Sequence, residues 1–311
     1  MTESYFFTPL VSIHLDSCRI LLTNLKLFIY IFLLTALPLS FLLRIIDAST
    51  YKLQAQIHHL ETLALFASTR FEARHVWEES RADAVSLIRF KAVFLVPCLC
   101  LSLASAVAVC SSVVVALTGK RPTLIGALTS VKVNWKRPLA TSLVVYSIQL
   151  GCAALLRVLA ASGAGVVAAA VGAGVELYLM AVLGLALVVS VNEDVVGWDA
   201  IVCAFGLMKG RRMVGFVLAG SILLMSSLVG WEMQGLMDEG ELFKEYSPER
   251  SKVMILMIGF GDGLGLVLLF GLVVLCSYVV TAVFYCECRR RNTIALVVKS
   301  DADVNGDEAS V

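Results

Sequence analysis

The sequence predicts an all-α membrane protein with about six transmembrane helices and additional amphipathic helices at the membrane interface. Its mean hydropathy is +0.87. Hydrophobic residues make up 59% of the chain and charged residues 16%, whereas soluble globular proteins carry about 25% charged residues. Apolar runs recur that are long enough for the roughly 20 residues of a membrane-crossing helix. The ten-residue alternating segments typical of a transmembrane β-barrel do not occur.

The apolar runs define six predicted spans within a single membrane domain that covers 1–290. The spans lie at about 27–43, 92–117, 139–159, 166–191, 214–230 and 253–284. Pro38 falls inside the first span and Pro97 inside the second, and membrane helices tolerate both. The last run exceeds the thickness of one bilayer, which predicts a tilt, a break or a protrusion. Residues 291–311 are predicted to form a disordered cytosolic tail, since small and acidic residues dominate there.

The segments before and after the first span have helical patterns. Residues 1–26 predict a short interfacial helix. In the long polar connection 44–91, apolar residues recur at alternating steps of three and four, which predicts an amphipathic helix rather than disorder. His58 and His59 lie in this connection, but adjacent residues of a helix point in different directions. We therefore interpret them as part of a solvated charged face and expect no metal site.

The connection 118–138 is basic and contains no Asp or Glu. Its bases are Lys120, Arg121, Lys132, Lys136 and Arg137. Apolar residues within 121–135 share one helical face, and Trp135 suits the aromatic belt of a membrane interface. We expect an interfacial helix on the cytosolic side. A role in binding anionic lipid is one interpretation of its charge, and membrane topology alone is the other.

The stretch 192–212 begins with acids and ends with bases, the order that a helix dipole favours. Val195, Trp198, Val202 and Phe205 fall on one helical face, which we expect to rest on the spans. Gly210 lies where the helix is expected to stop. The residues predicted to form a cytosolic interface are Glu193, Asp194, Gly197, Trp198, Lys209, Gly210, Arg211 and Arg212.

The distribution of Lys and Arg predicts the topology. Short connections are the best indicators of orientation, and the connections 118–138 and 192–212 are the more basic ones. With six spans, both lie on the same side as the two termini, so both termini are predicted to be cytosolic. The expected location is the endomembrane system or the plasma membrane.

Three ionisable residues lie inside predicted spans, namely Glu176, Asp262 and Arg157. A carboxylate within the bilayer is costly and is by default a hypothesis for a functional site. In a transporter, Glu176 and Asp262 would bind a cation or relay protons, with Arg157 as a partner. The alternative is an ion pair or hydrogen bond that serves only helix packing.

The final span is followed by Cys286 and Cys288, and cysteines beside a membrane are candidates for lipidation. The alternative is a pair of free thiols. The net charge of +1 and the absence of basic clusters with interleaved aromatic residues argue against a nucleic-acid partner. No catalytic motif is present at usable spacing, so we expect neither an enzyme nor a bound metal or cofactor.

Three stretches together resemble a family of uncharacterised plant multi-pass transmembrane proteins. The first runs from Thr-Gly-Lys at 118–120 to Trp-Lys-Arg at 135–137. The second is Val-Val-Ser-Val at 188–191 with Glu193, Asp194, Gly197 and Ala200, closing in Lys-Gly-Arg-Arg at 209–212. The third is Val-Phe-Tyr at 283–285 followed by Cys288. The chain departs from the family at Asn192 and Trp198. The resemblance implies a six-span membrane protein and implies no known activity.

Two functions are compatible with these features. The first is a non-enzymatic integral membrane protein that acts as a scaffold or regulator, with the lipid bilayer and other proteins as its partners. The alternative is a transporter or channel for ions or small solutes, which depends on Glu176 and Asp262 facing a shared polar cavity.

Overall fold

The predicted fold class is confirmed by a computed structural model, which describes residues 2–66, 69–161, 165–246 and 251–308. Every secondary-structure element in these ranges is helical. Six helical segments are long and apolar enough to cross a membrane. They are Leu25–Ala64, Arg74–Leu117, Lys136–Leu156, Ala170–Asn192, Arg212–Leu236 and Gly263–Thr293. Each contains or overlaps one of the six predicted spans.

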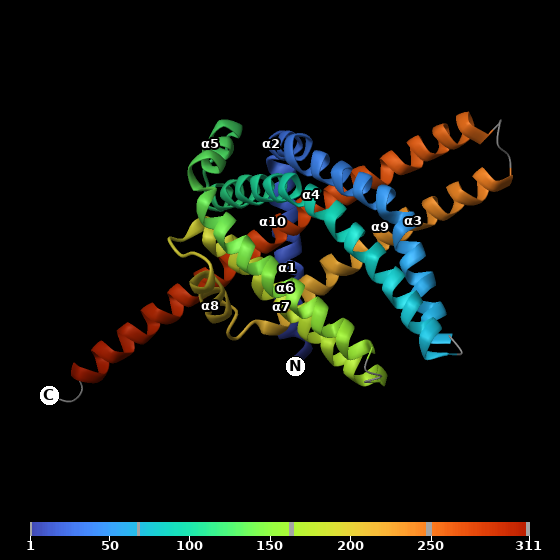
Figure 1. Cartoon of the computed structure of the whole chain (residues 1–311). Coiled ribbons are helices and arrows are strands. Elements are labelled where there is room, and N and C mark those ends of the chain that lie inside the picture. Colours follow the sequence, from blue (N-terminus) through green and yellow to red (C-terminus); the bar gives the residue numbers. More distant parts are fainter. Residues whose placement is uncertain (1, 67–68, 162–164, 247–250, 309–311) are drawn as a thin grey trace. The chain divides into compact units, whose positions relative to one another are not determined.

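The helices follow one another with short links (Figure 1). In chain order they are α1 (Thr2–Thr23), α2 (Leu25–Ile31), the π-helix η1 (Phe32–Ala36), α3 (Leu37–Phe66), α4 (Arg70–Leu117), α5 (Leu124–Asn134), α6 (Lys136–Ala161), α7 (Gly165–Asn192), α8 (Trp198–Leu207), α9 (Arg212–Tyr246) and α10 (Ser251–Glu308). The interfacial helices predicted at 1–26 and 121–135 correspond to α1 and α5.

Most of the polar connection 44–91 is helical, as predicted, but its residues belong to two helices rather than to one amphipathic helix. Its first part continues α3 and its second part begins α4. The backbone hydrogen bonds of a helix do not depend on side-chain polarity, so a helix continues past the apolar run where no breaker intervenes. The sequence between 44 and 66 contains neither glycine nor proline. The end of the apolar run therefore does not mark the end of the helix.

The π-helix η1 ends two residues before Pro38. Proline has no backbone N–H, so the carbonyl four residues earlier, at Leu34, loses its usual helical partner. A widened turn is one way to accommodate such an irregularity. The chain thus passes Pro38 without leaving the helical path, and α3 continues to Phe66.

Contacts divide the chain into two compact units. Unit 1 comprises Met1–Phe32, Leu103–Leu228 and Leu272–Val311, and unit 2 comprises Leu33–Ser102 and Val229–Gly271. Within unit 2, a guanidinium nitrogen of Arg44 donates to the backbone carbonyl of Met233 at 3.4 Å. This bond joins α3 to the second half of α9.

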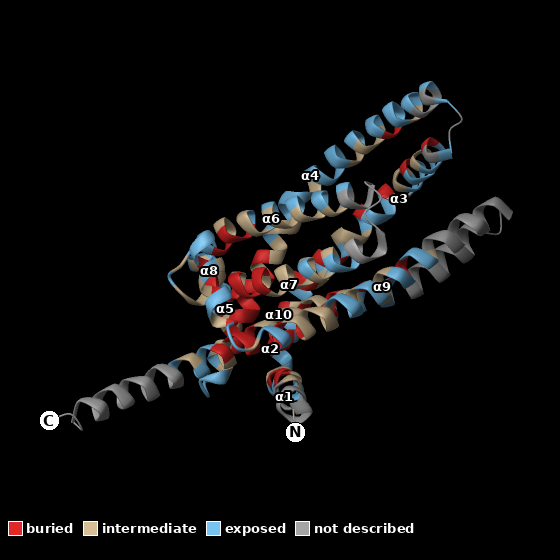
Figure 2. Ribbon diagram, turned by 90° about the horizontal axis from the view of Figure 1, so that it is seen from below, coloured by how far each residue is buried: buried red, intermediate tan, exposed pale blue. Residues whose placement is uncertain are grey.

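Unit 1 contains the main core, which Figure 2 shows as buried segments of α2, α7, α8 and α10. The largest fully buried side chains include Tyr285, Phe28, Ile31, Leu183, Leu185 and Met208. Helix α7 packs against both α6 and α8. A Cβ atom at Gly172 on α7 would overlap the side chain of Leu156 on α6. The small residues of α7 therefore permit the close helix approach that their composition predicts.

The C-terminal segment also differs from the sequence prediction. Helix α10 continues to Glu308, where a disordered tail is expected from residue 291. The segment 291–300 contains neither glycine nor proline. Nothing in its local sequence stops the helix that the last span begins.

Candidate functional site

Polar side chains from five parts of the chain contact one another within unit 1. They come from the start of α6, the link between α7 and α8, α8 itself, the residue before α9, and α10 between residues 285 and 290. We call this group the polar cluster and define it by Arg137, Asp194, Glu193, Cys203, Tyr285, Arg289, Arg211, Glu287 and Arg290.

Glu193 is the centre of the polar cluster. It directly follows α7, and its backbone N–H still donates to the Val189 carbonyl at 2.7 Å. The Tyr285 hydroxyl donates to Glu193 Oε1 at 2.7 Å, and Arg289 Nη1 lies 3.5 Å from the same oxygen. Arg289 also donates to the Tyr285 hydroxyl oxygen at 2.7 Å. The Cys203 thiol donates to Glu193 Oε2 at 3.5 Å. One carboxylate thus connects α7, α8 and α10.

A second charged group is centred on Glu287 of α10. Arg211 Nη2 is 3.2 Å from Glu287 Oε1, and Arg290 Nη2 is 3.3 Å from Glu287 Oε2. The other terminal nitrogen of Arg211, Nη1, is buried and has no hydrogen-bond partner. The pair between Arg211 and Glu287 joins the beginning of α9 to α10.

The start of α6 is attached to the link between α7 and α8 by two contacts. Arg137 forms an ion pair with Asp194, and the backbone N–H of Gly197 donates to the Thr141 hydroxyl at 2.9 Å. Gly197 has a φ of +62°, a region that residues with a Cβ atom rarely adopt. The glycine therefore fixes the turn that leads into α8.

The structure corrects the prediction of which face of α8 packs on the spans. Trp198 is 64% exposed and Val202 is also exposed, whereas Ala200, Ala204 and Met208 are fully buried. Helix α8 begins only at Trp198, after the turn at Gly197, so Val195 does not share its helical phase. Alanine allows a close approach of the helix backbone that the larger residues would prevent. The expected stop is confirmed, since Gly210 follows the helix with a φ of +92°.

Phe205 is partly exposed but has two aromatic contacts. Its ring lies edge-on to Tyr178 of α7, with 6.4 Å between the ring centroids. The Arg212 guanidinium lies 5.0 Å from the centroid of the Phe205 ring, within the range of a cation–π interaction. Phe205 therefore positions Arg212 as well as the end of α8.

Residues 2–295 match a protein family described as a domain of unknown function, DUF8558. The chain belongs to this family. No curated protein and no solved structure matches the chain. The DUF8558 match extends from α1 into the C-terminal part of α10 and so includes every residue of the polar cluster. Membership assigns no activity, and the function must be inferred from the structure.

In this DUF8558 chain, the predicted intramembrane residues and the predicted lipidation cysteines do not belong to the polar cluster. Glu176 is half-buried on α7, one helical turn before Met180. The side chains of Arg157 and Asp262 lie outside the described residues. Cys286 is half-buried and Cys288 is buried among core residues.

The predicted interface residues Glu193, Asp194, Gly197 and Arg211 belong to the observed contacts. Trp198 and Lys209 are exposed beside them, as are Gly210 and Arg212. Sequence reasoning did not select Tyr285, Glu287, Arg289 or Arg137, although the stretches that contain them carry the family resemblance. The charges of Glu287 and of the two arginines were the available indication of pairing, and the uncharged Tyr285 carried none.

Replacing Gly197 by alanine is expected to reduce the free energy of unfolding by about 1–3 kcal/mol, because the residue would have to keep a positive φ. The site has room for a methyl group, since only Val144 lies within 4 Å of an added Cβ, at 3.9 Å. The cost therefore comes from the backbone. Thermal unfolding of the purified protein in detergent measures it. Gly206→Ala in α8 is the control, because this glycine is helical and has open space around it. An equal loss in both variants would contradict the argument.

The Cys203 thiol is expected to react slowly with iodoacetamide at pH 7.5. Partial burial, followed by the adjacent Glu193 carboxylate, raises the pKa of Cys203. The neutral thiol is therefore favoured in the folded state. Its contribution to stability is present below the ordinary thiol pKa of about 8.5 and is lost as the pH rises towards the folded value. Mass spectrometry of alkylated peptides measures the rate, which Glu193→Gln should increase. The exposed Cys18 should not change; an unaltered Cys203 rate would contradict the role of Glu193.

Proposed function

We propose that this chain is a non-enzymatic integral membrane scaffold or regulator, and that the polar cluster forms its cytosolic interface with membrane partners. The observation that supports this most strongly is the convergence of α8, the residue before α9, and α10 on Glu193 and Glu287. Internal ion pairs hold the segments together, and several bases in the connections 118–138 and 192–212 and on α10 are exposed. These are Lys120, Arg121, Lys132, Lys136, Lys209, Arg212 and Arg291. A rigid basic surface of this kind fits anionic partners at a membrane surface.

The proposal places both termini in the cytosol, on the endomembrane system or the plasma membrane. The contacts that 192–212 makes with 118–138 and with residues 285–290 of α10 support one common side for these segments. The proposal also includes the multi-pass topology that the resemblance to plant membrane proteins implies. Glycosylation acceptor sites inserted after residues 120 and 209 should remain unglycosylated, and one inserted at 69 should be glycosylated. The opposite pattern would overturn the orientation.

The alternative is a transporter that uses Glu176 and Asp262. Glu176 is half-buried on α7 and is not among the residues that line the cavity described below. A variant free of native cysteines, carrying either Val175→Cys or Gly263→Cys, tests water access with a membrane-impermeant maleimide. We expect no labelling of Val175→Cys from either side, and labelling of Trp135→Cys as the positive control. Labelling of both Val175→Cys and Gly263→Cys would support a shared aqueous path and overturn the scaffold proposal.

A further inference from the structure

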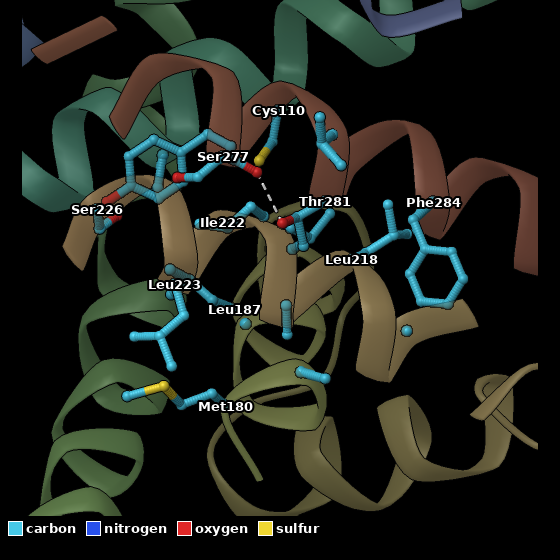
Figure 3. Close-up of a pocket in the computed structure, with 18 residues that line it drawn as sticks. Cys110, Met180, Leu187, Leu218, Ile222, Leu223, Ser226, Ser277, Thr281 and Phe284 are labelled. Atoms are coloured by element: carbon cyan, nitrogen blue, oxygen red, sulfur yellow. Dashed lines mark hydrogen bonds between the residues drawn. The ribbon is translucent and has the colours of Figure 1, made fainter. Parts of the chain in front are cut away.

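Unit 1 contains an apolar cavity between four helices, with a volume of about 320 Å³. Its walls come from α4, α7, α9 and α10. Figure 3 shows Met180 and Ser226 towards one end and Phe284 towards the other. The hydroxyls of Ser277 and Thr281 donate to backbone carbonyls, at 2.7 Å each. These hydroxyls already have acceptors in their own helix, so the cavity is suited to hydrocarbon.

The cavity opens to the surface of unit 1 along α9. Leu223 lines the cavity and is itself exposed. The lining segments of α4, α7, α9 and α10 all fall within helices long and apolar enough to cross a membrane. In a bilayer, the medium beside such an opening is hydrocarbon. An acyl chain can therefore enter from the side without crossing water.

The Phe284 end of the cavity lies next to the pair formed by Arg211 and Glu287. Arg211 is one helical turn before Gly215, whose N–H donates to the Arg211 carbonyl at 3.1 Å. Gly215 and Phe284 both line the cavity, and Glu287 is three residues beyond Phe284 on α10. The ion pair of 3.2 Å therefore lies one turn past this end of the cavity, where a lipid headgroup would be found if its chain occupied the cavity.

Arg211 has unused capacity for an anion. Its Nη2 contacts Glu287, but its buried Nη1 has no acceptor. A buried guanidinium N–H without an acceptor is unfavourable. A phosphate group supplies several oxygens and pairs well with arginine. It could engage Nη1 while Nη2 keeps its carboxylate partner. The exposed bases Lys209 and Arg212 flank Arg211 in the sequence and add positive charge.

We propose that this cavity binds one acyl chain of an anionic phospholipid, whose phosphate accepts hydrogen bonds from Arg211. The inference rests on the membrane placement in the proposed function and not on the scaffold role. A phospholipid is favoured over a free fatty acid because it is continuous with the bilayer at the opening and its phosphate offers more oxygens than a carboxylate.

The test uses the full chain, purified in detergent and stripped of lipid, then titrated with phosphatidylserine in mixed micelles. Native mass spectrometry measures how much lipid is retained. We expect one retained phosphatidylserine, held at least tenfold more tightly than phosphatidylcholine. Arg211→Gln should remove this preference, whereas Arg81→Gln, at an exposed base of α4 that belongs neither to the polar cluster nor to the basic surface, should change affinity less than twofold. Glu287→Gln should strengthen binding several-fold, because it removes the carboxylate that competes for Arg211.

A second variant keeps the test decisive if Arg211→Gln does not fold. Gly184 lines the cavity and has open space where a Cβ would lie. Gly184→Leu should therefore fill the cavity, preserve folding and reduce phosphatidylserine retention at least tenfold. Equal retention of both phospholipids, or unchanged binding in a folded Gly184→Leu variant, would overturn the proposal. Oleate binding without phospholipid binding would also overturn it. If the chain retains no phosphatidylserine and Val175→Cys is not labelled from water, the lipid-site proposal fails and the scaffold proposal stands.

Discussion

Glu193→Gln is expected to lower the free energy of unfolding by roughly 1.5–3 kcal/mol, the range for hydrogen bonds to charged groups. The Glu193 side chain is only 22% exposed, and its partner Tyr285 is 1% exposed. Glutamine can still accept a hydrogen bond from Tyr285 but offers no charge to Arg289. The thermal unfolding midpoint in detergent, with the fold followed by circular dichroism, measures the loss.

The neighbouring carboxylate provides a matched control. Asp194 is 88% exposed and pairs with an exposed Arg137, and exposed ion pairs contribute about 0–1 kcal/mol. Asp194→Asn should therefore have a much smaller effect than Glu193→Gln. Tyr285→Phe combined with Glu193→Gln should cost less than the sum of the two single changes, as expected for residues in contact. Similar losses in Glu193→Gln and Asp194→Asn would refute the central role of Glu193.

Met208→Ala is expected to cost about 2–5 kcal/mol, because truncation of a buried methionine removes apolar contacts and leaves a cavity. Met208 is 0% exposed and belongs to the core between α8 and its neighbours. Its side chain also lies against Gly215, where an added Cβ would come within 2.9 Å of Met208 Cε. Thermal unfolding and the yield of folded protein after solubilisation both report this loss.

Met213→Ala is the matched control, because it makes the same substitution at an exposed position. Its residue exposure is 68%, so Met213→Ala should change stability by less than about 0.5 kcal/mol. The comparison also tests which face of α8 is buried. If Trp198→Ala proved more costly than Met208→Ala, the face first predicted from periodicity would be the packed one.

The sequence predicts the spans well because the bilayer imposes a length and a composition on each of them. It is less informative about where helices end. The polar residues after Arg44 do not interrupt α3, because the polarity of a side chain does not determine where the backbone hydrogen bonds of a helix end. The phase of α8 was also wrong, because Val195 and Trp198 look continuous in the sequence. The positive φ of Gly197 separates them, and no apolar periodicity reveals a backbone angle.

Some residues of the candidate site could likewise be predicted from the sequence, and others could not. Glu193, Asp194 and Arg211 stand out in the sequence because they are charged and flank apolar runs. Tyr285 lies 92 residues from Glu193 along the chain, and no local pattern connects the two. Glu287 is hidden for a related reason, since the basic residues that follow it in the sequence already balance its charge. Such pairs are set by tertiary packing, which composition and periodicity do not describe.

Helix α10 presents Ser277, Thr281 and Phe284 to the cavity and, within the next turn, Tyr285 and Arg289 to Glu193. The two sites therefore share one rigid element and cannot respond independently to its movement. Any ligand that favours one position of α10 over another changes the affinity at the other site, and by thermodynamic linkage the effect is equal in both directions. The affinity of a partner for the polar cluster would then depend on whether the cavity is occupied.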